Sequence, residues 1–219
     1  MTERPKSSHE PARGKEPVVF VIDDDASMRG ALTNLFQSVG LQAEAFGSAT
    51  EMLQRKLPDV ASCLVLDIRL PALNGLDFQT ELAKANIHIP IIFMTGHGDI
   101  PMTVRAMKAG AIDFLTKPFR HQEMLDAVAT AIERDRKRRE DDKMISNAQA
   151  RVETLTPRER DVLALVAAGL MNKQIAAELG IAEITVKIHR GHVMKKMGTR
   201  SLADLVRITE MLGIRRAQP

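Results

Sequence analysis

The sequence predicts an α/β domain followed by a smaller domain made only of helices. Short apolar runs alternate with amphipathic stretches through the first half of the 219-residue chain, which is the pattern of a repeated strand–helix unit. A helical pattern without a breaker then runs from Gln122 to about Ala150, and no strand pattern follows Leu155. Repeated strand–helix units form a parallel sheet with helices on both faces, so we expect a (βα)5 doubly wound sheet.

The predicted strands of that sheet are Val18–Ile22, Gln42–Phe46, Cys63–Leu66, Ile91–Met94 and Ile112–Leu115. Gln42–Phe46 alternates between apolar and polar residues and suits an edge, whereas the other runs are apolar enough for a sheet covered on both faces. The amphipathic stretches between them are Ala26–Val39, Ala49–Arg55, Leu76–Ala85 and Ile100–Ala109. Together these elements predict one α/β domain over residues 17–130.

The segments beside this domain have different compositions. Residues 1–16 contain charges and Pro but no apolar segment, so we expect a disordered tail and no signal peptide. Residues 131–151 continue a helical pattern and are interpreted as a helical linker. The apolar stripe of this helix fades after Ile132, and charges of alternating sign follow from Glu133 to Lys143. This pattern favours a solvated linker helix, with a coiled coil as the alternative.

Residues 152–213 are predicted to form four helices, at about 156–168, 171–179, 183–197 and 201–213. Thr156, Pro157 and Glu159 make a capping box with Pro at the first helical position. The second helix ends at Gly180 and the third begins near Glu183, which is a helix-turn-helix layout.

The third of these helices is predicted to have an apolar back and a cationic front. We expect it to pack Ile184, Ile188, Val193 or Met194, and Met197 inward. Its other face would carry Lys187, His189, Arg190, His192, Lys195 and Lys196. A cationic helix of this kind fits the major groove of DNA.

The charges of the chain are separated between its two ends. Residues 17–118 contain eight basic and eleven acidic residues, whereas residues 151–219 contain twelve basic and seven acidic ones. A basic C-terminal domain indicates a polyanionic partner. The alternative is that these charges are only solvated surface charge. No apolar run approaches the length of a membrane span, and Cys63, the only cysteine, is expected to be a buried inert thiol. These features favour the cytoplasm.

Acidic residues follow two of the predicted strands directly. Asp23, Asp24 and Asp25 come after Val18–Ile22, and Asp67 comes after Leu66. Because ligands of open parallel sheets bind beyond the carboxyl ends of the strands, we expect these carboxylates to meet. Like charges at one place resist ionisation unless a cation joins them, and oxygen ligands suit Mg²⁺.

The next two strands also end in polar side chains, namely Thr95 and Thr116-Lys117. A carboxylate, a metal ion, a hydroxyl and an ammonium at one edge of a sheet are the parts of a phosphoryl-transfer site. Asp67 would be the nucleophile that forms an acyl phosphate. Asp25 is better interpreted as a solvated or helix-capping acid, and Thr116 as a bystander.

With these site residues, residues 17–130 resemble the receiver domain of bacterial two-component response regulators, a CheY-like domain. The matching segments are Val21-Ile22-Asp23-Asp24-Asp25, Leu66-Asp67-Ile68-Arg69-Leu70-Pro71, Asn74-Gly75, Met94-Thr95-Gly96-His97-Gly98 and Lys117-Pro118-Phe119. The resemblance implies that Asp67 is the phospho-acceptor. It also implies that Asp24 and Asp67 bind Mg²⁺ directly and that Asp23 binds it through water. The carbonyl of Arg69 would complete the coordination shell of the ion.

The resemblance has three further implications. Thr95 and Phe114 take the switch positions of the family, although periodicity alone favours Phe114 as a core residue. The Lys117–Pro118 peptide is expected to be cis. The strand order is expected to be 2-1-3-4-5.

Residues 152–213 resemble the LuxR-type DNA-binding domain of the FixJ/NarL regulators. The matching residues are Leu155-Thr156-Pro157-Arg158-Glu159, Gly169-Leu170, Asn172-Lys173, Ile175-Ala176, Leu179, Thr185-Val186-Lys187 and His189. The resemblance gives Lys187, His189 and Arg190 roles in the groove and places Lys173 and Thr185 near phosphates. His192 and Lys195 are further candidate DNA contacts. Each could read a base or touch a phosphate, and the alternative is a solvated side chain without a DNA contact.

Two features of this domain leave its contacts open. Gly191 stands where many relatives carry a larger polar residue, and it puts base contact at that turn in doubt. The helix Ser201–Gly213 forms the DNA-bound dimer in this family, and completion of the domain's own core is the alternative.

The sequence therefore predicts a response regulator of the FixJ type and not an enzyme. A histidine kinase would phosphorylate Asp67 with Mg²⁺, and the protein would then bind promoter DNA, act on RNA polymerase and dimerise on DNA or when phosphorylated. The sequence also allows two alternatives. Asp23-x-Asp25-x-Ser27 resembles the start of Asp-nucleophile phosphatases, and the receiver could instead be a dimeriser that needs no phosphate.

Overall fold

The computed structural model describes residues 16–214 except residues 72 and 97–99. Apart from Glu16, the predicted tail of residues 1–16 therefore lies outside the described residues. The chain forms two compact units, which divide between Arg139 and Glu140.

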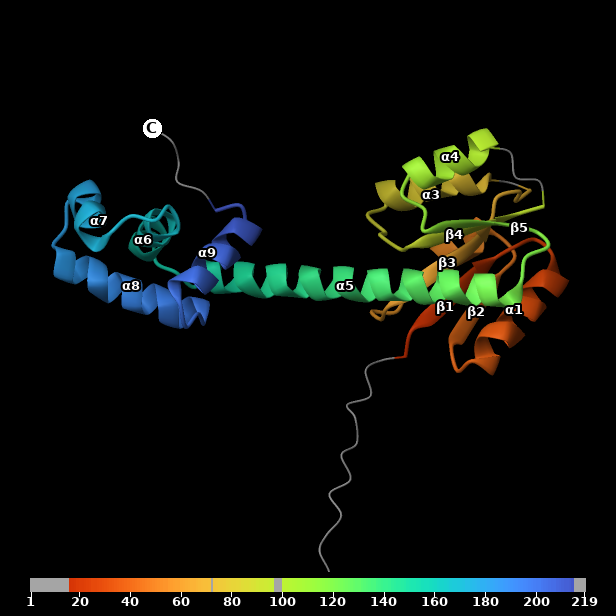
Figure 1. The fold of residues 1–219 in the computed structure, drawn as a ribbon, viewed down its shortest axis with the longest axis horizontal. Coiled ribbons are helices and arrows are strands. Elements are labelled where there is room, and N and C mark those ends of the chain that lie inside the picture. Colours follow the sequence, from red (N-terminus) through yellow and green to blue (C-terminus); the bar gives the residue numbers. More distant parts are fainter. Residues whose placement is uncertain (1–15, 72, 97–99, 215–219) are drawn as a thin grey trace, which may run out of the picture. The chain divides into compact units, whose positions relative to one another are not determined.

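A five-stranded parallel sheet is the centre of the first unit (Figure 1). Its strands are β1 (Val18–Ile22), β2 (Gln42–Phe46), β3 (Ser62–Asp67), β4 (Ile91–Thr95) and β5 (Asp113–Thr116). They lie in the order β2-β1-β3-β4-β5, which confirms both the α/β class predicted from the sequence and the order implied by the resemblance. The strand β2, at the edge, is the alternating one, as its pattern predicted.

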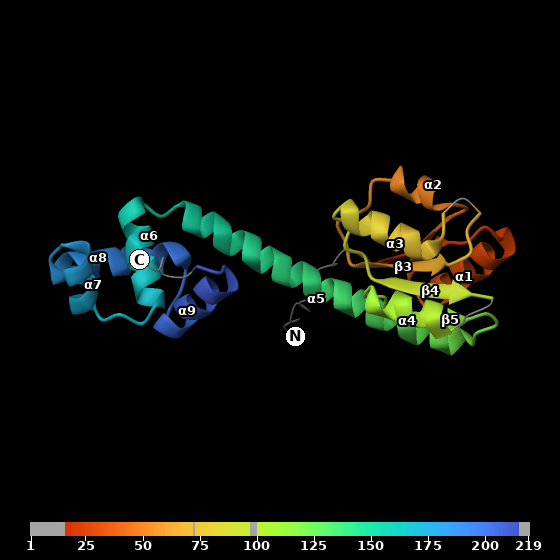
Figure 2. The ribbon, with the colours of Figure 1, turned by 90° about the horizontal axis from the view of Figure 1, so that it is seen from above.

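Helices cover both faces of this sheet (Figure 2). They are α1 (Ala26–Ser38), α2 (Ala49–Leu53), α3 (Gly75–Lys84), α4 (Ile100–Lys108) and the first part of α5 (His121–Glu153). Alternate residues of β1 point to opposite faces: Phe20 packs with the core under α2, α3 and α4, and Val21 packs with the core under α1 and α5. Cys63 is fully buried in the second of these cores, and burial raises the pKa of its thiol to about 12.

The helix α5 continues without interruption for 33 residues. Met124, Val128 and Ile132 form its buried stripe against the sheet, and most side chains after Ile132 are exposed, as the fading apolar pattern predicted. Ala148 and Asp135 are buried exceptions, and Asp135 is fully buried although it is charged.

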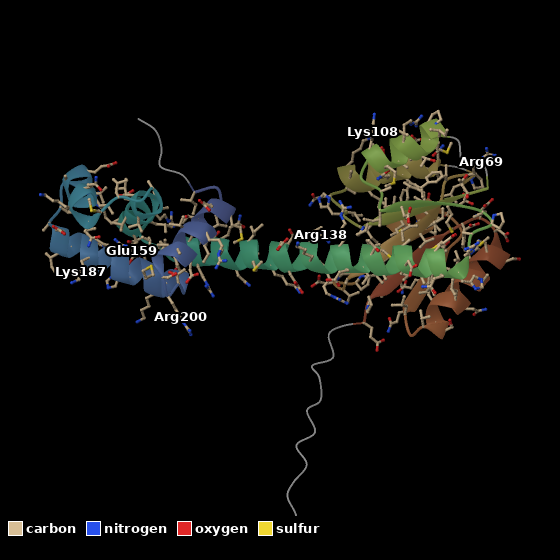
Figure 3. All side chains as sticks on the ribbon, in the orientation of Figure 1. Arg69, Lys108, Arg138, Glu159, Lys187 and Arg200 are labelled. Carbon is tan, nitrogen blue, oxygen red and sulfur yellow. The ribbon has the colours of Figure 1, made fainter. Side chains whose placement is uncertain are left out.

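Asp135 is buried because it collects several hydrogen-bond donors. The backbone N–H of Ser62, at the start of β3, donates to Asp135 Oδ2 over 2.9 Å. Arg138 Nη2 and Arg139 Nε lie 2.8 and 2.7 Å from its two carboxylate oxygens, and Arg139 Nη1 also binds Asp59. Arg138 is labelled in Figure 3, at the opposite end of the sheet from Arg69. This cluster fastens α5 to the amino end of β3, and nothing in the charge pattern of the linker predicted it.

The second unit consists, in its described part, of the end of α5 and the helices α6 (Pro157–Ala167), α7 (Asn172–Leu179), α8 (Glu183–Met197) and α9 (Leu202–Met211). Its core includes Val162, Val166, Ile175, Val193 and Leu205. The predicted four-helix domain is thus confirmed. None of the described helices is long and apolar enough to span a membrane.

The packing face expected for α8 is confirmed for Val193 and Met197 and wrong for Ile184 and Ile188. Ile184 and Ile188 are 64% and 52% exposed, whereas Val186, Val193 and Met197 are buried. Two apolar stripes run along this helix, at 184/188 and at 186/193/197, and only contact with α6 and α7 decides which one faces inward. The sequence alone offers no means of choosing between them.

Replacement of Asp135 by Ala is expected to lower the free energy of unfolding of the first unit by about 2–3 kcal/mol, because it leaves the Ser62 N–H unpaired and two arginines without their buried partner. Urea unfolding followed by circular dichroism measures this change. Asp126→Ala, at an exposed position of the same helix, is the matched control and should change stability by about 0.5 kcal/mol or less. Equal effects of both substitutions would show that the cluster adds no stability.

Candidate functional site

The register of the sheet brings the acidic strand ends together. Ile22 pairs with Leu66, so Asp23 and Asp67 come next to each other at the carboxyl edge of β1 and β3. Asp23 is fully buried and Asp67 is 7% exposed. The sequence-based expectation that these carboxylates meet agrees with the structure.

Lys117, which follows β5, lies between the two carboxylates. Its Nζ is 2.6 Å from Asp23 Oδ2 and 2.7 Å from Asp67 Oδ2. The remaining oxygens accept backbone N–H groups, from Asp25 to Asp23 Oδ1 and from Arg69 to Asp67 Oδ1. Each carboxylate therefore has one oxygen held by the main chain and one held by the ammonium group.

Two opposing effects act on the charges of this pocket: burial disfavours the charged forms, and pairing between Lys117 and the carboxylates favours them. Desolvation raises the pKa of Asp23 above its usual value, against the hydrogen bond from Lys117 that favours the charged carboxylate. Burial on its own would lower the pKa of Lys117, but the hydrogen bonds to Asp23 and Asp67 raise it above the usual range. Lys117 is therefore a positive charge at neutral pH, fixed at the point where the negative charges converge.

The pocket also has the donors of a cation site. Asp23, Asp24 and Asp67 each offer a carboxylate oxygen, and these oxygens lie within 4.8 Å of one another. Asp24 is exposed, which leaves the pocket open to solvent on its side. Oxygen-only donors with room for water fit Mg²⁺ better than a transition metal. The Arg69 backbone lies beside this group through its bond to Asp67, and its side chain is labelled in Figure 3.

The other predicted site residues lie around this pocket. Thr95, the last residue of β4, is fully buried, and its carbonyl accepts the N–H of Lys117 over 2.7 Å. Phe114 is partly buried and packs against the core under α3 and α4. The Lys117–Pro118 peptide is cis, as the resemblance implied. Asp25 is the N-cap of α1 and accepts the N–H of Ser27, which confirms its capping role.

The structure gives the physical reason for Gly75, which the motif Asn74-Gly75 did not supply. A Cβ at this residue would lie 2.9 Å from the carbonyl oxygen of Asp67 and 3.0 Å from Ile68 Cα. The N–H of Gly75 donates to the Ile68 carbonyl over 2.9 Å. Only a residue without a side chain permits this close approach, which supports the backbone that carries Asp67.

The second unit contains the expected helix-turn-helix. The helix α7 ends at Leu179 and is capped by Gly180, whose φ of 64° is left-handed, and the N–H of Ile181 donates to the Ala176 carbonyl. The exposed face of α8 has helical spacing and carries Ile184, Lys187, Ile188, Gly191, His192 and Lys195. Figure 3 shows Lys187 on the side of α8 away from α6 and α7. This face is cationic and apolar, with the Gly191 position leaving space in its middle.

On α8, the side chains of Arg190 and Lys196 bond to groups of their own unit. Arg190 Nη1 donates to Asn172 Oδ1 over 3.0 Å, which connects α8 to α7. The Nδ1 of His189 is buried. Lys196 Nζ is 2.6 Å from Glu159 Oε2 and also donates to the Thr154 carbonyl. Thr185 is half-buried, and Lys173, on α7, is exposed.

Glu159 joins the two helices α6 and α8. It completes the predicted capping box, because Thr156 Oγ1 accepts the Glu159 N–H and Glu159 Oε2 accepts the Thr156 N–H. The hydrogen bond from Lys196, followed by the bond from the Thr156 N–H, lowers the pKa of Glu159 to about 2. Glu159 is consequently a buried carboxylate that is ionised throughout the neutral range.

Two family models match the chain. Residues 19–129 match the response regulator receiver domain, and residues 153–209 match the bacterial regulatory proteins of the luxR family. The two matched ranges correspond to the acidic pocket and to the helix-turn-helix described above.

Individual relatives match along almost the whole chain. Nodulation protein W of Bradyrhizobium diazoefficiens is 72% identical over 197 residues, which cover 90% of this chain and 87% of the relative. The transcriptional regulatory protein FixJ of Azorhizobium caulinodans is 40% identical, with 90% and 93% covered. Among solved structures, the response regulator StyR superposes with a TM-score of 0.79 at 49% identity, covering 89% of this chain and 98% of StyR.

Acid is expected to weaken the second unit through Glu159. Because the pKa of Glu159 in the folded chain is about 2, below the ordinary value of 4.5, its ionised form stabilises the fold above about pH 4.5. This contribution is lost as the pH falls from 4.5 through 2. In metal-free buffer, the difference in free energy of unfolding between the wild type and Glu159→Gln should therefore be constant above pH 5 and shrink below it.

Glu210→Gln, at an exposed position of α9, is the control and should show no such pH dependence. The chain has no Trp or Tyr, so circular dichroism of the helices is the suitable signal. A Glu159→Gln difference that grows between pH 4.5 and 2 would contradict the assignment.

Proposed function

Because the chain belongs to the bacterial response regulators that join a receiver domain to a LuxR-type helix-turn-helix domain, we propose that phosphorylation of Asp67 switches it to bind promoter DNA and activate transcription. This family is the one expected from the sequence motifs. The observation that carries the proposal is Lys117, held by Asp23 and Asp67 at the open end of the sheet.

In the proposed reaction a carboxylate oxygen of Asp67 attacks the phosphorus of a phosphohistidine on a partner kinase. A P–O bond forms, the P–N bond breaks, and the leaving imidazole keeps the electron pair and takes a proton from water. Asp23, Asp24 and Asp67 would hold Mg²⁺, with Asp23 acting through water and the Arg69 carbonyl as a further ligand. A bound Mg²⁺ neutralises charge on the phosphoryl oxygens.

Lys117 would then change partners. Its ammonium group, which now pairs with Asp23 and Asp67, is already within reach of any group carried on Asp67 Oδ2. A phosphoryl group brings about −1.5 to −2 charge and strong acceptor oxygens, so it competes well for this ammonium group. Thr95 would donate its hydroxyl to another phosphoryl oxygen, and Phe114 would move with it.

The phosphatase alternative requires Asp23 as the nucleophile. Asp23 is fully buried, and its two oxygens are bonded to Lys117 and to the Asp25 N–H. The oxygens of Asp67 are bonded in the same way, but its side chain is 10% exposed whereas that of Asp23 is fully buried, so Asp67 is the carboxylate that a phosphodonor can reach. The geometry therefore supports a phospho-acceptor at Asp67 in preference to turnover at Asp23.

The output surfaces of the proposed switch carry exposed apolar side chains. On α4, the residues Ile100, Val104 and Met107 are 81%, 44% and 44% exposed, and we assign receiver dimerisation to this face. On α9, Leu205 is buried whereas Leu202 and Met211 are 41% and 39% exposed, so this helix has both a core face and a face for a dimer on DNA.

The DNA surface is proposed to be the exposed face of α8. Lys187, His192 and Lys195 would reach the major groove, with Ile184 and Ile188 available for thymine methyl groups. Lys173 and Thr185 would lie near phosphates. His189 and Arg190, which were expected to face the groove, lie at the inner margin of this surface, where Arg190 is held by Asn172.

We further propose residues 17–130 as the receiver, 131–151 as the linker and 152–213 as the DNA-binding domain. The protein would act in the cytoplasm, where a histidine kinase and promoter DNA are both within reach, and RNA polymerase would be its target once it is bound to DNA.

The test compares promoter binding with and without phosphorylation. Full-length protein treated with acetyl phosphate and Mg²⁺ should bind its promoter at least about tenfold more tightly than untreated protein, a coupling of ordinary size for such switches. Asp67→Asn should bind equally in both conditions. Asp25→Asn is the matched control, since Asn caps helices as well as Asp does, and it should respond like the wild type.

Sedimentation of the same samples distinguishes two ways in which phosphorylation could raise the affinity for DNA. A dimer that forms only on phosphorylation assigns the switch to the receiver face, and a monomer that binds more tightly assigns it to release of the DNA-binding domain. Promoter binding that is equal for the phosphorylated wild type and for Asp67→Asn would refute the switch and favour a receiver that dimerises without phosphate.

A further inference from the structure

A second group of metal-ligating side chains lies outside the acidic pocket, in the helix-turn-helix unit. Glu159 from α6 and His189 and His192 from α8 each offer one ligand atom, and these three atoms lie within 4.8 Å of one another. His189 and His192 are three positions apart on one helix, so their side chains are neighbours on its surface. The capping box fixes Glu159 opposite them. Two separate helices therefore deliver two imidazoles and one carboxylate to the same place.

The spacing within this group fits ligands that share one ion. His192 Nδ1 is 3.6 Å from Glu159 Oε1, which is too long for a hydrogen bond. Two ligands at about 2.0–2.1 Å from a tetrahedral zinc ion are about 3.3–3.4 Å apart. A small movement of the exposed His192 side chain would therefore bring both atoms to coordination distance.

The hydrogen bonding of these groups also suits a ligand set. Glu159 Oε2 is held by the Thr156 N–H and by Lys196, which leaves Oε1 directed at His192. The Nδ1 of His189 is buried and has no hydrogen-bond partner among the described residues. The bonds to Oε2 act as the outer support that positions a ligating carboxylate.

We propose that Glu159, His189 and His192 form a binding site for a divalent transition ion of the zinc class, with water in the fourth position. Two nitrogen donors and one oxygen donor exclude Mg²⁺ and Ca²⁺ as the preferred ions. The Lys196 ammonium group is 2.6 Å from Glu159 Oε2 and repels a cation. The site is therefore weaker than a closed structural zinc site, and we expect a dissociation constant in the micromolar range.

Metal binding at this site would act on the proposed DNA surface. His192 belongs to the exposed face of α8 together with Lys187 and Lys195. An ion that holds the His192 imidazole against Glu159 removes this side chain from the groove-facing surface. It also joins α6 to α8 and fixes the angle at which α8 is presented.

The test is calorimetric titration of the full-length protein with Zn²⁺ in excess Mg²⁺, which occupies the receiver pocket. The wild type should show a micromolar site that His192→Gln weakens at least tenfold, the minimum expected when a ligand is lost. His192 is largely exposed, so this variant keeps its fold. His121→Gln, at an exposed histidine of α5, is the matched control and should retain the site.

Nuclear magnetic resonance of the histidine rings locates the ion independently. Zn²⁺ should shift the ring signals of His189 and His192 together at one equivalent, and Mg²⁺ should leave both unchanged. The proposal is overturned if His192→Gln binds Zn²⁺ like the wild type, if the dissociation constant reaches the millimolar range, or if zinc shifts other histidine rings only.

Discussion

The convergence of negative charge at one edge of the sheet is the constraint on which the receiver unit depends. Asp23 and Asp67 are brought together by the pairing of β1 with β3, and the ammonium group of Lys117 and two backbone N–H groups hold them there. Such a pocket is stable only while a cation balances it, because like charges at this distance repel strongly in a medium of low dielectric constant. The same requirement makes the pocket responsive, since any new anion on Asp67 must redistribute the available positive charge.

The helix-turn-helix unit also contains a buried negative charge, which different groups compensate. Glu159 is a buried carboxylate whose charge is compensated by Lys196 and by the N–H of Thr156, the N-cap of α6. Because this compensation fixes the position of α8 from its inner side, the outer side of the helix is left for recognition. Asp135 has the corresponding role in α5, where two arginines and the Ser62 N–H hold a charged residue inside the receiver. Each of these carboxylates joins elements that are distant in the sequence.

The sequence predicted those features that depend on local pattern. The strands, their order by resemblance, the capping box and the residues of the acidic pocket follow from apolar runs, turn residues and the positions of acids after strands. Features that depend on contacts between elements were not predictable. The inward face of α8 was assigned to Ile184 and Ile188 because apolar character alone cannot distinguish two competing stripes. The burial of Asp135 inside a charge run, and the meeting of Glu159 with His189 and His192, require knowledge of which helices touch.

The central claim is that the convergence of carboxylates at this edge places Asp67 to attack phosphorus with the help of a divalent cation. The most direct measurement is mass spectrometry of the full-length protein after incubation with acetyl phosphate, with and without Mg²⁺, followed by mapping of the modified peptide. The account predicts a single acid-stable, base-labile phosphoryl group on Asp67 that forms only with Mg²⁺. Modification of a different carboxylate, or labelling of Asp67 that is unchanged without the divalent cation, would contradict it.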